Sequence, residues 1–161
     1  MRRWVLAIAM TAVLSSGSAF AADEEIYGTY RLIGTSQRVL ETGEVVTMAK
    51  EQGFITYGRD GRMMVLITRG DRPKLENFEK MTDQHRIALF ATMTAYAGTF
   101  KFDGKTLEHH VDISWNEMWT GTTQIRDVKR DGERLSLSTR PAPSPRDGRM
   151  SVTTLVWEKL K

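Results

Sequence analysis

The chain has 161 residues, with 23 Lys and Arg against 20 Asp and Glu, and no cysteine. Without cysteine there are no disulfides, thiol nucleophiles or cysteine metal ligands, so apolar burial and sheet hydrogen bonding must stabilise the fold. The charge is nearly balanced and no dense run of Lys and Arg alternates with aromatic residues, so the composition excludes nucleic acid as an expected partner. The length is that of one domain.

The first residues have the layout of a secretory signal peptide. Arg2 and Arg3 precede an apolar run over residues 4–14, and Ala19 and Ala21 supply the small side chains that signal peptidase requires before a cut. The run has 11 residues, which at about 1.5 Å per residue span only about half of the roughly 30 Å hydrocarbon core. We therefore expect a cleaved leader and no membrane span. The arginine pair also fits a twin-arginine leader, an alternative export route.

A cut after Ala21 divides the chain into a signal peptide, residues 1–21, and one mature domain, residues 22–161. Because both arginines of the leader are lost, 21 basic residues then stand against 20 acidic ones, and the mature net charge is +1. The expected location is the periplasm or the extracellular medium.

The mature chain consists mostly of expected β-strands separated by turn dipeptides. Glycine accepts the positive φ that tight hairpin turns need, and Asp accepts it better than most residues. Five dipeptides mark the expected reversals: Thr42-Gly43, Asp60-Gly61, Asp103-Gly104, Asp131-Gly132 and Asp147-Gly148. Apolar and β-branched runs predict eight or nine strands: residues 27–40, 45–48, 54–57, 63–68, 99–102, 106–115, 119–128, 135–139 and 150–157.

A chain with so many short strands closes into a barrel or splits into a sandwich, because an open sheet leaves edges that pair with other chains. We expect closure. The predicted fold class is therefore all-β with one inserted helix: a single antiparallel barrel of eight or nine strands, preceded by the signal peptide.

The inserted helix is expected within residues 82–96. Its apolar positions recur at helical spacing: Leu89, Phe90, Met93 and Tyr96. Thr82 is a suitable N-cap, and Asp83 lies in the first turn, where the helix dipole favours an acid. We expect this helix to lie across one mouth of the barrel.

Several runs, taken in order, resemble the bacterial lipocalin-like domain family. They are Gly28-Thr29-Tyr30-Arg31-Leu32, Gly53-Phe54-Ile55-Thr56-Tyr57 before Asp60-Gly61-Arg62-Met63, Tyr96-Ala97-Gly98-Thr99-Phe100, His109-His110-Val111-Asp112, Trp119-Thr120-Gly121 with Gln124 and Arg126, and Leu135-Ser136-Leu137-Ser138. The similarity extends from about Ile26 to Glu158. The resemblance implies a calycin-type barrel with a helix inserted in the middle. It implies little about activity, because barrels of this shape include carriers and enzymes.

Residues 106–115 contain the expected site histidine. Their apolar face is formed by Leu107, His109, Val111, Ile113 and Trp115, and their polar face by Glu108, His110, Asp112 and Ser114. By the two-residue period of a strand the apolar face points into the barrel, so His109 is the expected buried histidine. Gln124 and Arg126 share a face of the next strand and converge on His109 if that face points inward.

Two hypotheses explain this polar group. In the functional one, Arg126 binds the charge of an anionic or carbonyl-bearing apolar ligand, Gln124 hydrogen-bonds to it and His109 gives or takes a proton. In the structural one, a neighbour satisfies His109, and Arg126 meets Glu44, Glu158 or a backbone carbonyl. The sequence leaves both open.

Aromatic residues complete the expected ligand-binding set. Tyr57, Tyr96 and Trp119 are amphipathic side chains that can line a cavity, with core packing as the alternative role.

Neither a metal site nor a cofactor is expected. The three histidines are His85, His109 and His110, and the two adjacent ones point to opposite faces of a strand. A single inward histidine is a weak basis for haem binding. The sequence contains no Gly-rich phosphate loop and no nucleophile elbow.

The sequence therefore predicts an exported lipocalin-like protein that binds a small, mostly apolar molecule inside the barrel without transforming it. One alternative is an isomerase or cyclase for a hydrophobic substrate, with His109 as general acid or base and Arg126 stabilising negative charge. Another is a barrel filled by its own side chains that acts as a surface interaction module.

Overall fold

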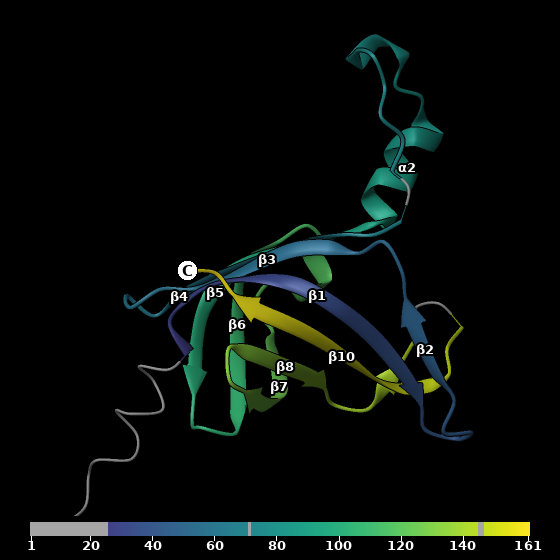
Figure 1. Ribbon diagram of the computed structural model, residues 1–161. Helices are drawn as coiled ribbons and strands as arrows, with labels where there is room; N and C mark the ends of the chain where they lie inside the picture. The colour runs from purple at the N-terminus through teal and green to yellow at the C-terminus, as the bar shows by residue number, and fades with distance from the viewer. Residues whose placement is uncertain (1–25, 71, 145–146) are drawn as a thin grey trace, which may run out of the picture.

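The computed structural model describes residues 26–70, 72–144 and 147–161, and within them eight antiparallel strands close into a barrel (Figure 1). The expected signal peptide and its cut after Ala21 lie outside the described residues. The barrel strands are β1 (Gly28–Val39), β3 (Gln52–Tyr57), β4 (Arg62–Thr68), β5 (Met93–Phe102), β6 (Thr106–Ser114), β7 (Thr123–Asp131), β8 (Arg134–Thr139) and β10 (Met150–Lys159). Pairing of β1 with β10 closes the ring. The predicted barrel is thus confirmed, with two short additional strands: β2 (Val45–Met48) beside β1 and β9 (Ala142–Pro143) beside β10.

The two ends of the barrel differ in their connections. At the hairpin end, short turns join β3 to β4, β5 to β6 and β7 to β8. At the loop end lie the longer connections, residues 40–51, 69–92, 115–122 and 140–149. In all five predicted turn dipeptides the glycine has a positive φ, from 57° to 92°, which confirms the predicted reversals.

The core fills the barrel from the hairpin end. Ile26 precedes β1 and is fully buried, and it packs among inward side chains from seven strands. The core members are Ile26, Tyr30, Leu32, Ile55, Tyr57, Met63, Val65, Ile67, Tyr96, Leu107, Val111, Leu135, Leu137 and Trp157. Their positions alternate along each strand, because successive side chains of a strand point to opposite faces.

A β-bulge changes the predicted inner face of β6. Ala97 is opposite Ile113 and Gly98 is opposite Val111, so Asp112 is the extra residue. The alternation predicted for residues 106–115 therefore holds up to Val111 and is wrong beyond it, and Ile113 is 68% exposed. Glycine is required beside the bulge, because a Cβ at Gly98 would lie 1.8 Å from the backbone oxygen of His110.

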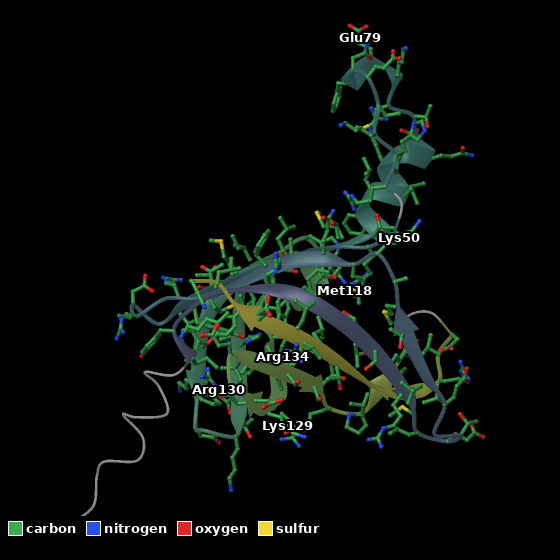
Figure 2. The ribbon with its side chains drawn as sticks, viewed as in Figure 1. Lys50, Glu79, Met118, Lys129, Arg130 and Arg134 are labelled. Atoms are coloured by element: carbon green, nitrogen blue, oxygen red, sulfur yellow. The ribbon has the colours of Figure 1, made fainter. Side chains whose placement is uncertain are left out.

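Residues 69–70 and 72–92 form an arm that projects away from the barrel (Figure 1). It contains a 3-10 helix, η1 (Phe78–Lys80), and the helix α2 (Asp83–Ala91), and Figure 2 shows Glu79 at its tip. Thr82 is the N-cap of α2, as predicted, and its side chain accepts a hydrogen bond from the backbone of His85.

The predicted extent and position of the inserted helix are wrong. Met93 and Tyr96 belong to β5, where their backbone pairs with β4, and α2 ends at Ala91. No residue of α2 is buried, so the helix does not lie across the mouth. Arg72 holds the base of the arm by donating to the carbonyl of Leu89 and to the Thr92 hydroxyl, at 2.9 and 2.8 Å.

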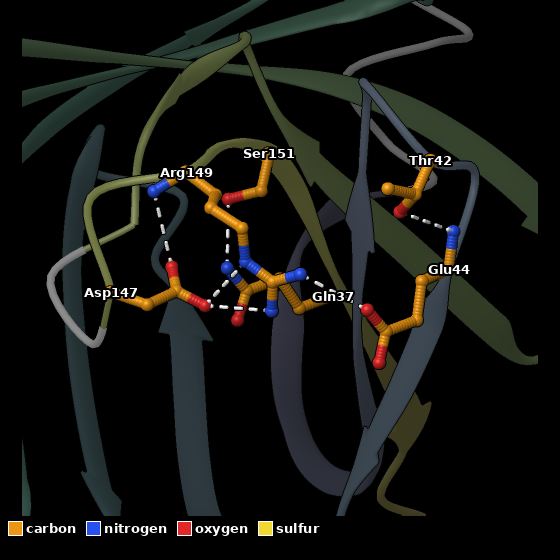
Figure 3. Close-up of polar contacts among 6 residues, drawn as sticks. All are labelled: Gln37, Thr42, Glu44, Asp147, Arg149 and Ser151. Carbon is orange, nitrogen blue, oxygen red and sulfur yellow. Dashed lines mark hydrogen bonds and ion pairs between the residues drawn. The ribbon is translucent and has the colours of Figure 1, made fainter.

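Polar contacts also tie the loop end together (Figure 3). Arg149 pairs with Glu44 at 3.0 Å and with Asp147 at 2.8 Å, and Gln37 donates to the hydroxyl of Ser151 at 2.8 Å. These contacts connect β1 and its turn to the start of β10. Within the described ranges, helices are too short or too polar to cross a membrane.

Candidate functional site

His109 lies inside the barrel between two tyrosines. It is on the inner face of β6 and only 1% exposed. Its Nε2 is 2.9 Å from the hydroxyl of Tyr57 on β3, and its Nδ1 is 2.9 Å from the hydroxyl of Tyr96 on β5. Both ring nitrogens are therefore engaged, as the structural hypothesis for His109 required.

The surroundings keep this cluster neutral. Burial lowers the pKa of His109 to about 3, and the positive charge of Arg126 acts in the same direction. Burial also raises the pKa of Tyr57 and Tyr96, so both hydroxyls keep their protons at neutral pH. The cluster contains a neutral imidazole and two intact hydroxyl groups.

Arg126 points into the barrel beside this cluster. It pairs in register with Leu107, which is fully buried, and paired residues of neighbouring strands share a face. Its charge opposes the effect of burial on both tyrosines and it hydrogen-bonds to the side chain of Tyr96. Arg126 and His109 therefore converge in the interior.

The partners of Arg126 differ in part from those in the structural hypothesis. Arg126 donates to the backbone oxygen of Ile125 at 2.8 Å. Glu44 is paired with Arg149, and Glu158 is paired with Arg31 at 3.1 Å. Across residues 26–70, 72–144 and 147–161, no carboxylate forms an ion pair with Arg126.

Gln124 and Trp119 lie nearer the loop end. Gln124 is directly opposite His109 in the β6–β7 pairing, on the inner face, and it donates to the hydroxyl of Thr122 at 3.0 Å. Trp119 belongs to a 3-10 helix, η2 (Glu117–Trp119), and not to the start of a strand, because β7 begins at Thr123. The Trp119 ring packs edge-on against Tyr96, with centroids 5.7 Å apart.

Aromatic rings connect the base of the arm to the cluster. The ring centroids of Phe90 on α2 and Trp115 are 6.3 Å apart, and those of Trp115 and Trp119 are 4.8 Å apart. Trp119 in turn contacts Tyr96. The structure therefore brings together the six ligand-binding residues predicted from the sequence, in one region of the barrel: His109, Gln124, Arg126, Tyr57, Tyr96 and Trp119.

Sequence reasoning also missed other inward polar groups. Arg130 donates to the hydroxyl of Tyr30 at 3.2 Å, and its place on the Gln124–Arg126 face was a signal that could have identified it. Thr35 Oγ1 and Trp157 Nε1 are buried and have no hydrogen-bond partner among the described residues. No local pattern distinguishes these two from ordinary core positions.

The two walls of the interior differ in accessibility. The inward side chains Ile55, Tyr57, Met63, Val65 and Ile67 of β3 and β4 are buried. The inner face of β7, which includes Gln124, Arg126 and Val128, keeps part of its surface accessible. The accessible part of the inner wall therefore lies on the β7 side.

Two hollows lie outside the barrel. One, of about 460 Å³, is lined by outward residues that include Ser36, Arg38 and Asp127. The other, of about 350 Å³, lies between the β2–β3 connection and the base of the arm, beside Met48 and Arg69. Neither is lined by the His109 cluster.

Comparison with known proteins identifies one family. The sequence model of the lipocalin-like domain family matches residues 27–160. No curated protein sequence matches the chain significantly. The match covers the whole barrel and every residue of the candidate site.

Proposed function

Because the chain belongs to the lipocalin-like domain family, we propose that it is an exported protein that binds a small, mostly apolar molecule inside its barrel without transforming it. The observation that carries the proposal is the inner face of β7, where Gln124 and Arg126 are partly accessible beside an otherwise apolar core. An apolar site with a few convergent polar groups is typical of small-molecule binding.

The state of His109 favours binding over catalysis. A general base works best when its pKa is close to the working pH, whereas the pKa of His109 is about 3. Both ring nitrogens are already hydrogen-bonded to tyrosines. His109 therefore orients the two hydroxyls and is a poor proton acceptor for a substrate.

Export is supported by the N-terminal sequence. Arg2 and Arg3, the apolar run and the Ala19-Phe20-Ala21 segment have the layout of a cleavable leader. Expression of the full chain in its native type of cell should yield a periplasmic or secreted protein whose first residue is Ala22. N-terminal sequencing of the purified protein measures this directly, and an intact N-terminus in the cytoplasm would refute export.

Extraction of the purified native protein tests the binding function. Mass spectrometry should recover one apolar compound, unchanged after incubation with the protein. Recovery of two compounds whose interconversion is abolished by His109→Ala would instead support the isomerase or cyclase alternative. If no compound is recovered and no apolar fluorescent probe is displaced or bound, the binding proposal is wrong.

One observation favours the surface interaction module as a second candidate. Phe54 and Leu66 are directly opposite each other on the outer face of β3 and β4, and both are about half exposed. Met64 and Ile113 lie beside them at 62% and 68% exposure, on either side of Ala97. If the barrel binds no small molecule and Phe54→Glu abolishes self-association in sedimentation experiments, this candidate replaces the first.

A further inference from the structure

The cluster of Tyr57, His109 and Tyr96 contains more hydrogens than its two hydrogen bonds can use. A neutral imidazole has one N–H, and each tyrosine has one O–H. These three hydrogens share two contacts, one at Nε2 and one at Nδ1. At least one hydroxyl hydrogen is therefore directed away from the histidine. If the imidazole were protonated, both ring nitrogens would donate to the tyrosines, and both hydroxyl hydrogens would be directed away. A hydroxyl hydrogen therefore remains unused whatever the charge of His109.

No described residue accepts this remaining hydrogen. The only hydrogen-bond acceptor for the Tyr57 and Tyr96 hydroxyls in the described part of the chain is His109. Arg126, which contacts Tyr96, has donors only. A buried hydroxyl without an acceptor is costly, so the interior favours a molecule that brings one.

Other donor groups in the interior have no carboxylate partner among the described residues. Arg126 is cationic, and apart from Tyr96 its hydrogen bond is to the backbone oxygen of Ile125. Inside the same core, the buried indole N–H of Trp157 has no partner among the described residues. A cation and uncompensated donors in an apolar interior attract an anion, because burying an unpaired charge is expensive.

We propose that Arg126 and the free tyrosine hydroxyl bind the carboxylate group of the apolar ligand. A planar carboxylate offers two acceptor oxygens, which matches the fork of a guanidinium and leaves a lone pair for the hydroxyl. One carboxylate neutralises Arg126, which has no ion-pair partner among the described residues, whereas a phosphate dianion would leave excess negative charge in the core. This assignment rests on the proposed binding function and specifies its ligand class.

Binding of three matched compounds tests the assignment. They share one saturated twelve-carbon chain and carry a carboxylate, a methyl ester or a primary alcohol. Titration calorimetry with the purified protein at pH 7.5 should give at least a tenfold lower Kd for the carboxylate. The preference should decline as the pH falls below about 5, where the carboxylate is protonated.

Variants locate the preference. Arg126→Gln should bring the affinity for the carboxylate close to the affinity for the ester, so that their ratio is near one, while the ester still binds. Of Tyr57→Phe and Tyr96→Phe, the one that removes the free hydroxyl hydrogen should weaken carboxylate binding severalfold. Arg130→Gln is the matched control, because Arg130 lies on the same face of β7 but binds Tyr30, and it should keep the preference.

The outcomes separate the two proposals. If ester and alcohol bind the wild-type protein as tightly as the carboxylate, the carboxylate assignment is overturned and small-molecule binding stands. If none of the three compounds binds the folded protein, the carboxylate assignment and the binding of apolar chains inside the barrel are both overturned. If Arg126→Gln does not fold, the wild-type ratio and its pH dependence decide, and Arg126→Lys should retain part of the preference. A preference that survives in folded Arg126→Gln contradicts the assignment.

Discussion

The barrel and the arm contain similar apolar side chains and place them differently. On the barrel's inner face Leu107, Tyr30 and Leu135 are fully buried. On the arm Phe78, Ile87 and Phe90 are 74%, 67% and 55% exposed, and neither η1 nor α2 buries any residue. The same kind of side chain therefore stabilises one region and contributes little folding energy to the other.

The difference shows two ways of specifying structure. In the arm, local contacts define α2: the Thr82 cap, its capping box with His85 and the Arg86–Asp83 ion pair at 2.7 Å. In the barrel, strands far apart in sequence pair and bury a common core, as β1 does with β10. We therefore expect the barrel to unfold as one unit and the arm to open at a lower free energy.

The largest expected effect contrasts a buried and an exposed aliphatic residue. Leu107→Ala should lower the free energy of unfolding by about 2 to 5 kcal/mol, because it leaves a cavity in the core. Ile87→Ala on the arm, the matched control, should change it by less than about 0.5 kcal/mol. Urea denaturation followed by tryptophan fluorescence measures both. Equal losses in the two variants would show that the arm is packed in solution.

The next effect is the pH dependence of barrel stability. The pKa of His109 is about 3 in the folded state and about 6.5 when unfolded. Between these values the unfolded chain binds more protons, so stability is complete above pH 6.5 and is lost as the pH falls towards 3. From pH 7 to pH 5 the free energy of unfolding should fall by about 2 kcal/mol through His109.

His109→Gln should remove that part of the pH dependence in denaturation curves recorded at both pH values. His85→Gln changes a half-buried histidine of the arm and serves as the control. It should keep the wild-type pH dependence of barrel stability. If His109→Gln kept the wild-type pH dependence of stability, His109 would not be buried as a neutral imidazole.

The smallest effect concerns the arm alone. Thr82→Ala removes the N-cap and should destabilise α2 by about 1 kcal/mol, since an unpaired backbone N–H is left at its start. Amide hydrogen exchange should become faster in residues 83–91, while the midpoint of barrel unfolding stays unchanged. Gln84→Ala, at an exposed position of the same helix, should not accelerate exchange. A lower barrel midpoint in Thr82→Ala would mean that the two regions are coupled.

The candidate site was predictable in its membership and not in its contacts. Alternation along single strands placed His109 on an inner face and Gln124 and Arg126 on one shared face. The pairing of β7 with β6 decided that this face points inward. The distance between Tyr57 and His109 depends on β3, β4, β5 and β6 pairing in the observed register, which no local pattern encodes. That no described carboxylate pairs with Arg126 likewise emerges only when Glu44 and Glu158 are seen paired elsewhere.

The amino-acid sequence by itself determined most of the strands, the turn reversals at glycine and the inward side of β6 up to Val111, because these depend on the two-residue period and on the positive φ of glycine. Only the tertiary structure decided the bulge that turns Ile113 outward, the direction of the arm and the tyrosine pair around His109. Those features depend on contacts between strands distant in the chain, where packing overrides local preference.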